Sequence, residues 1–237
     1  MSLSVYSKTA IFSKNVGSLA SPNRDALVGE WFFGVDQQST IANRAGSLPL
    51  TPVGNAPAYN EGFVKFGPTG GANGNNAFTV PTVPKLDGGM TIVVVARNNA
   101  ASGLSSIIKT TSGSTSNVGI YDSTGKLAYY SGGTALGDMA QVDAPAANKW
   151  AVVATVCGRG DYGQINLWQN SVRKVGNAPV VGKREAAIYP PYTLFNAVAT
   201  NIDIAYLAIY ERNVPEDELL KIYEGLKQMM LLRGVTL

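Results

Sequence analysis

Two runs of consecutive apolar residues constrain the fold of this chain more than any other feature. Residues 90–97 read MTIVVVAR and residues 149–156 read KWAVVATV. β-Branched residues are stiff in a helix and pack well on a pleated sheet. A run that is apolar at successive positions is typical of a strand buried on both faces. We therefore predict two central strands, each covered on both sides.

Shorter segments of the same character recur along the chain, separated by Gly, Asn and Pro. They span residues 26–33, 62–66, 103–109, 117–121, 126–130, 164–169, 172–175, 186–189 and 201–211. Asn170-Ser171 predicts a tight hairpin turn between two of them, whereas residues 34–62 and 67–76 carry the turn residues typical of loops. More than ten short strands at regular spacing predict an all-β fold of two packed antiparallel sheets. A closed barrel is the alternative.

One helix is predicted near the C-terminus, over about residues 215–231. Pro215 suits a first helical position, and the acidic residues 216–218 suit the positive end of the helix dipole. A single apolar face follows from the spacing of Leu219, Ile222, Tyr223, Leu226 and Met230. The chain thus divides into an N-terminal arm or edge segment (1–25) and one domain (26–237).

Composition excludes several classes of function. The chain has no histidine, which is the commonest general base and metal ligand. Its one cysteine, Cys157, lies in an apolar run and is expected to be a small buried residue. With 19 basic and 16 acidic residues and no basic stripe, no nucleic-acid partner is expected. No apolar stretch approaches 18 residues, and no signal peptide is recognisable, so we expect cytoplasmic synthesis and no membrane insertion.

Several segments resemble, in chain order, those of concanavalin A-like and laminin-G-like jelly rolls. They are residues 26–31 with 43–46, then 90–97, 149–150, 165–171 and 202–220. The last is the most specific match, because it resembles the closing strand of these domains running into a short helix. The resemblance covers about residues 26–230. It implies a two-sheet antiparallel jelly-roll sandwich with one C-terminal helix.

Within this group the chain is most similar to domains of bacteriophage tail and virion proteins. That resemblance implies a non-enzymatic protein of the virion that recognises a host cell-surface glycan, takes part in particle assembly, or does both. It also implies a homo-oligomer, with a trimer favoured, and contacts with other virion proteins. The arm (1–25) and the apolar C-terminal segment (229–237) are the expected contact segments.

The same fold family contains glycoside hydrolases, so an enzyme that degrades polysaccharides, as a hydrolase or lyase, is the alternative function. Retaining hydrolysis needs two carboxyl groups about 5.5 Å apart. The chain has no strand with closely alternating carboxylates: Asp203 and Glu211 are eight residues apart, and an aromatic strand and a turn separate Glu30 from Asp36. We therefore expect no catalytic residues.

Metal binding is left open by the sequence. Related legume-type lectins hold Ca²⁺ and a transition metal in a loop that includes histidine, which this chain lacks. No cofactor is expected, but a single Ca²⁺ held by aspartates and backbone carbonyls remains an alternative. The candidate ligands are Asp122, Asp138, Asp143 and Asp161.

Aromatic side chains are the candidates for carbohydrate binding, because sugar rings stack on exposed aromatic faces. They are Tyr129, Tyr130, Trp168, Tyr189 and Tyr192. Adjacent strand residues point to opposite faces, so either Tyr129 or Tyr130 faces outward. Trp168 alternates with apolar neighbours and is expected to be exposed on its hairpin. The dipeptide 190–191, Pro-Pro, is expected to keep Tyr189 and Tyr192 out of any central strand.

Each aromatic candidate has a structural alternative. A strand aromatic in a sandwich is often a core residue, and the segment 189–192 is alternatively a rigid loop that packs against a neighbouring subunit. The two other tryptophans, Trp31 and Trp150, are predicted to lie in the core.

Overall fold

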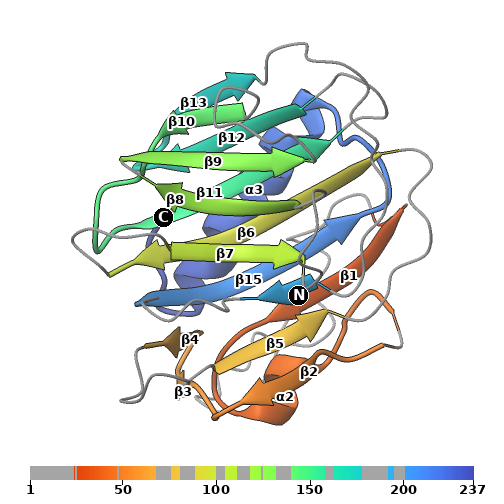
Figure 1. Ribbon diagram of the computed structural model, residues 1–237, viewed down its shortest axis with the longest axis vertical. Helices are drawn as coiled ribbons and strands as arrows, with labels where there is room; N and C mark the ends of the chain where they lie inside the picture. Colours follow the sequence, from red (N-terminus) through yellow and green to blue (C-terminus); the bar gives the residue numbers. More distant parts are fainter. Residues whose placement is uncertain are drawn as a thin grey trace, which may run out of the picture.

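A computed structural model describes residues 24, 26–46, 48–67, 76–80, 89–99, 105–110, 118–123, 125–131, 140–157, 163–177, 192–194 and 201–237. These residues form two antiparallel β-sheets packed face to face, with one long helix on the outside (Figure 1). The predicted all-β sandwich with a C-terminal helix is confirmed. The predicted arm lies, except for Arg24, outside the described residues.

Sheet A contains the two strands predicted from the apolar runs. Its order is β13 (Val172–Asn177), β12 (Gly163–Gln169), β11 (Trp150–Cys157), β6 (Met90–Asn98), β15 (Ile202–Tyr210), β4 (Phe63–Phe66) and β3 (Ala58–Asn60), and β1 (Leu27–Phe32) also pairs with β15. Strands β6 and β11 are neighbours near the middle of this sheet. Every described position of β11 is buried, as the apolar run predicted.

Sheet B is built largely from shorter strands. Its order is β10 (Ala140–Asp143), β9 (Lys126–Ser131), β8 (Val118–Ser123), β7 (Ser105–Thr110), β14 (Tyr192–Leu194), β5 (Asn76–Val80) and β2 (Thr51–Gly54).

The sequence did not predict β2, β3, β5, β10 and β14, nor the short helix α2 (Gln37–Ile41). Strand β2 shows why: it contains Pro and Gly, and all four of its residues are exposed at the sheet edge, where proline is tolerated. The strand predicted over 186–189 lies outside the described residues.

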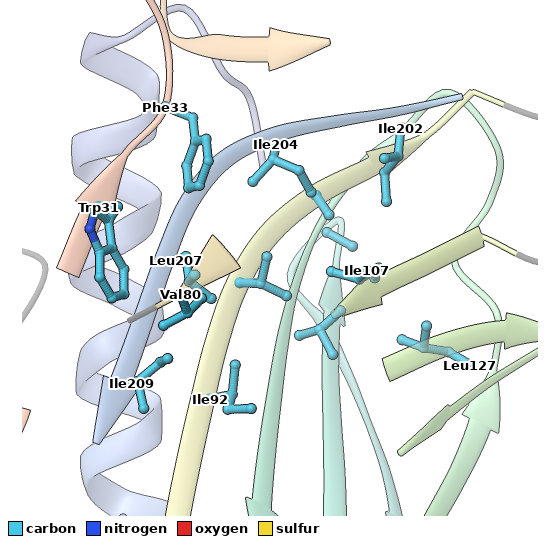
Figure 2. Close-up of a cluster of buried hydrophobic side chains, with 14 of the residues drawn as sticks. Trp31, Phe33, Val80, Ile92, Ile107, Leu127, Ile202, Ile204, Leu207 and Ile209 are labelled. Atoms are coloured by element: carbon cyan, nitrogen blue, oxygen red, sulfur yellow. The ribbon is translucent and has the colours of Figure 1, made fainter. Parts of the chain in front are cut away.

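The inner faces of the two sheets enclose an apolar layer (Figure 2). Trp31 and Phe33 enter it from β1 and the residue after it, and the rings of Phe66 and Phe78 meet edge to face with centroids 5.8 Å apart. Trp31 is fully buried, which confirms its predicted core position. We call this region the inner layer.

Helix α3 (Glu216–Leu232) covers the outer face of sheet A and creates a second buried layer, the outer layer. All five residues of its predicted apolar face are buried. All nine residues of β15 are buried, because the inner layer covers one face of this strand and α3 covers the other. No helix of the described chain is long and apolar enough to cross a membrane.

The end of the chain is part of this outer layer. Met229, Met230 and Val235 are buried, so their apolar character is explained by packing within the domain rather than by contacts with other copies. Leu231 and Leu232 remain exposed. Arg233 anchors the helix end by donating hydrogen bonds to the carbonyl oxygens of Phe33 (2.7 Å) and Gly62 (3.4 Å).

Burial lowers the pKa of Arg233 to about 10, and the nearby charge of Arg44 contributes to the shift. The ring of Phe32 lies 5.4 Å from the guanidinium carbon of Arg233. A side chain at Gly62 would place its Cβ 2.2 Å from the carbonyl oxygen of Arg233, which excludes any larger residue at this approach.

Candidate functional site

A hollow of about 380 Å³ opens on the outer face of sheet A, where helix α3 begins. Its lining comes from β11, β12, the connection between β15 and α3, and the first residue of α3, namely Val156, Gln164, Asn213, Val214, Pro215 and Glu216. The hollow exists because the chain leaves β15 and rises over the sheet before the helix starts. Its lining combines apolar groups with amide and carboxylate groups.

A set of hydrogen-bonded polar side chains, which we call the amide cluster, extends from the hollow along β12 and β13: Gln164, Asn166, Arg173 and Asn177. Of these four residues, Gln164 belongs to the lining of the hollow. Residues 164, 166 and 168 of β12 face outward because Ile165 and Leu167 face the inner layer. The side-chain amide of Asn166 donates to Gln164 Oε1 (2.9 Å), and that of Gln164 donates to Asn177 Oδ1 (3.0 Å). Asn166 is fully buried, so its bonds fix the position of the whole cluster.

Arg173 is held on three sides. Its Nε and Nη2 donate to Asn166 Oδ1 at 3.2 and 2.6 Å, and its guanidinium carbon lies 5.4 Å from the ring centroid of Trp168. Its Nη1 forms an ion pair with Glu216, the first residue of α3. The arginine side chain is 25% exposed and that of Glu216 is 69% exposed. The cluster thus presents a rigid guanidinium beside an accessible carboxylate.

The predicted exposure of Trp168 is wrong. Its side chain is only 3% exposed and stacks on Tyr223 of α3, with ring centroids 5.3 Å apart and an interplanar angle of 12°. Alternation along β12 correctly places Trp168 on the outer face, but the helix covers that face. Trp168 therefore packs beneath the guanidinium of Arg173, and its ring is not accessible for stacking on a sugar.

The expectation that the two prolines keep Tyr192 out of a central strand is also wrong. Tyr192 is the first residue of β14, an interior strand of sheet B, and pairs with Val80 and Thr110. Proline has no N–H to donate to a neighbouring strand. A short strand can nevertheless begin directly after two prolines, because its own residues supply all the N–H groups that pair with its neighbours. Tyr189 lies outside the described residues, as does the Tyr192 side chain.

Tyr129 and Tyr130 lie in β9, and their side chains are outside the described part of the chain. Tyr129 pairs with Ala140, whereas Tyr130 pairs with Gly119.

Of the four candidate calcium ligands, only Asp143 has a described side chain, and lysines already surround it. Lys126 Nζ lies 2.5 Å and Lys174 Nζ 3.8 Å from its oxygens. The hydrogen bond from Lys126, followed by the charges of both lysines, lowers the pKa of Asp143. Among the residues with described positions, no group of three His, Cys, Asp or Glu side chains could hold a metal ion.

Two buried carboxylates lie elsewhere on the outer face of sheet A. Glu30 accepts a hydrogen bond from the Tyr206 hydroxyl (3.0 Å) and forms an ion pair with Arg24 at 3.4 Å. Asp203 pairs with Arg97. Neither carboxylate belongs to the lining of the hollow.

The guanidinium of Arg97 is enclosed by aromatic rings, with its central carbon 4.6 Å from the ring of Trp150 and 5.3 Å from that of Phe63. Trp150 is 8% exposed, which agrees with its predicted core position.

The sequence reasoning missed the amide cluster and Glu216 as site residues. One signal was present: Gln164 and Asn166 are polar residues that alternate with the apolar residues Ile165 and Leu167. That signal locates a polar face. It does not show that Glu216, 43 residues beyond Arg173, meets the same face.

The sequence matches no family model and no curated protein. Among solved structures, the chain is similar to the binding domain of botulinum neurotoxin DC in complex with SialylT, with a TM-score of 0.62 and 12% identity. It is also similar to the botulinum neurotoxin serotype D binding domain (TM-score 0.59, 11% identity). A third similar structure is the Trypanosoma rangeli sialidase in complex with sialic acid (TM-score 0.60, 12% identity).

These matches cover 85%, 88% and 86% of this chain. The chain spans about half the length of the two toxin chains (52% and 53%) and 33% of the sialidase chain. At such low identity the likeness shows the fold alone: this chain shares the two-sheet β-sandwich of these proteins.

Proposed function

We propose that this chain is a non-enzymatic glycan-binding domain of a bacteriophage particle, and that it binds its glycan in the hollow beside the amide cluster. The observation that carries the proposal is the composition of that hollow. Gln164, Asn213 and Glu216 line it, and Arg173 is paired with Glu216. Glycan hydroxyl groups both donate and accept hydrogen bonds, and amide side chains offer both functions.

Rigidity favours binding at this place. Ordering a loose side chain on binding costs about 0.5–1.5 kcal/mol. In the amide cluster the hydrogen bonds among Gln164, Asn166 and Asn177 have already ordered the groups. A ligand in the hollow therefore meets donors and acceptors whose positions are already set.

The structural neighbours support a saccharide as the ligand class. One similar structure is a binding domain in complex with SialylT, and another is a sialidase in complex with sialic acid. The sandwich of this chain is therefore an architecture that also occurs in a protein in complex with SialylT and in one in complex with sialic acid. The proposal transfers only the ligand class, since the matches cover only 52% and 33% of those chains.

The environments of the buried carboxylates support a non-enzymatic role. A glycosidase acid or nucleophile must reach the glycosidic bond. Glu30 and Asp203 are both buried and paired with arginines, and they lie outside the lining of the hollow. The alternative, a polysaccharide-degrading hydrolase or lyase, predicts release of reducing ends from a bacterial polysaccharide and loss of that release in Glu30→Gln or Asp203→Asn.

The bacteriophage setting and the oligomer rest on the sequence resemblance. A homo-trimer held by the N-terminal arm predicts that light scattering gives three times the chain mass for the full chain and the mass of one chain after deletion of residues 1–23. The C-terminal residues do not offer an equally clean deletion, because Val235 is buried and Arg233 anchors α3. A single-chain mass for both proteins would contradict the trimer.

A glycan array on the full chain tests the binding function. Gln164→Ala removes a lining amide and is expected to reduce the bound signal at least about fivefold, the loss of roughly one hydrogen bond. Gln228→Ala is the matched control, since Gln228 is exposed on α3 and remote from the lining. Equal signals for wild type and Gln164→Ala would place the binding site elsewhere. No bound glycan at all would refute the function.

A further inference from the structure

The ion pair between Arg173 and Glu216 indicates which glycans the hollow takes. We infer that it binds acidic saccharides, whose carboxylate replaces that of Glu216 on Nη1 of Arg173. This inference rests on the proposed function and narrows its ligand class. The protein itself shows the recognition geometry, because a carboxylate that lines the hollow, that of Glu216, already occupies that edge of the guanidinium.

The contacts of the Arg173 guanidinium are of two kinds, fixed contacts with buried residues and one replaceable contact with the exposed Glu216. Its Nε and Nη2 are committed to Asn166, a fully buried residue, and its face lies over Trp168, which is buried as well. These contacts hold the arginine in place whether or not Glu216 is bound. Arginine recognises carboxylates by charge-assisted hydrogen bonds of defined direction, so a fixed guanidinium selects a carboxylate in one position.

Glu216 is the replaceable partner. Its side chain is 69% exposed, and ion pairs between exposed groups are weak. The two carboxylates that follow it on α3 have cations of their own: Asp217 pairs with Lys221 at 3.5 Å, and Glu218 pairs with Arg212. Displacing Glu216 from Arg173 therefore leaves these neighbouring charges paired, and the guanidinium keeps its positive charge for the incoming carboxylate.

Two substitutions that each remove one negative charge distinguish this exchange of carboxylates from a long-range effect of net charge. Glu216→Gln removes the competing carboxylate, and Asp217→Asn removes one charge from the adjacent position, where the side chain is 76% exposed and does not contact Arg173. Exchange predicts that the ratio of acidic to neutral affinity rises about three- to tenfold in Glu216→Gln and changes less than twofold in Asp217→Asn.

The experiment measures binding of sialylated oligosaccharides and their asialo counterparts, and of oligogalacturonates and their methyl esters, on an array and then by calorimetric titration. The wild type is expected to prefer the acidic member of at least one pair. Arg173→Lys keeps the charge but loses the planar fork, and it is expected to lower that preference about tenfold. Thermal melting confirms that this variant is folded.

The outcomes distinguish the inference from the function on which it rests. Binding of neutral and acidic members with equal affinity overturns the inference and leaves glycan binding intact. If the ratio of acidic to neutral affinity rises as much in Asp217→Asn as in Glu216→Gln, the exchange is overturned, because the effect would then come from long-range charge. The absence of binding to every glycan in the wild type overturns both.

Discussion

The two buried layers of this protein differ in how they are held together. The inner layer, between the sheets, is a cluster of aliphatic and aromatic side chains. The outer layer, between sheet A and α3, contains buried tyrosines, and four buried polar or charged residues lie on that face: Glu30, Thr91, Asn166 and Asp203. The candidate site belongs to the outer layer.

The difference follows from what covers each face. Two broad sheets exclude water from nearly the whole inner layer, so a polar group there would lack a partner. A single helix covers only a stripe of sheet A, and polar groups at its margins can meet partners from the helix and its connections. Arg173 and Glu216 are one such pair, and the Thr91 hydroxyl, which bonds the chain between β15 and α3, is another example.

The largest expected effect tests the close packing of the inner layer. Phe66→Ala removes a fully buried ring that packs edge to face on Phe78, and it is expected to lower the free energy of unfolding by about 3–5 kcal/mol. Unfolding in guanidinium chloride, monitored by tryptophan fluorescence, measures this loss. Val53→Ala, at a half-exposed position of edge strand β2, is the control and should change stability by less than about 0.5 kcal/mol. A loss below about 1 kcal/mol for Phe66→Ala would mean that the layer is loosely packed.

The next effect tests the ionic part of the outer layer. Asp203→Leu leaves the guanidinium of Arg97 without its carboxylate and is expected to cost about 3 kcal/mol, the lower end for a broken buried pair because Arg97 is 27% exposed. The double variant Arg97→Met with Asp203→Leu should recover most of this loss, since one oxygen of Asp203 is buried with no hydrogen-bond partner. A double variant as unstable as the single one would show that the pair itself stabilises the fold.

Two threonines allow a matched test of both layers. Thr91 Oγ donates to the carbonyl oxygen of Arg212 (2.8 Å) and accepts from the N–H of Val214 (2.9 Å) in the outer layer. Thr155 lies on the inner face, and its hydroxyl is buried with no partner. Thr91→Val is expected to cost about 2 kcal/mol, whereas Thr155→Val should stabilise by up to about 1 kcal/mol. Denaturation curves of both variants measure whether the free energy of unfolding falls in Thr91→Val and rises in Thr155→Val. Equal changes in the two variants would contradict the proposed contrast between the layers.

The smallest effect is local and belongs to neither layer. Asn170 and Ser171 have φ of +50° and +62° in the hairpin between β12 and β13. Ser171→Gly should relieve about 1 kcal/mol of strain and lose one exposed hydrogen bond with Lys227, for a net gain of about 0.5 kcal/mol. That gain corresponds to roughly 1–2 °C in Tm by calorimetry. Asn170→Gly should gain less, because asparagine adopts this conformation readily. A lower Tm for Ser171→Gly would mean that the contact with Lys227 outweighs the strain.

The sequence by itself determined the elements whose cause is local. A run of successive apolar and β-branched residues is typical of a strand buried on both faces, so β6 and β11 were predictable as central strands. The apolar spacing of α3 and the turn at 170–171 were predictable for the same reason, since each depends on neighbours within a few residues. These elements were sufficient to predict two antiparallel sheets and a C-terminal helix.

Only the tertiary structure decided which faces water reaches. Alternation placed Trp168 on the outer face of its strand, but burial there depends on α3, which follows about 50 residues later. Short strands such as β14 form because two neighbours supply their hydrogen bonds, which local propensity does not report. The amide cluster with Glu216 arises in the same way: the sequence contains its polar residues, but the path of the chain over sheet A brings them together.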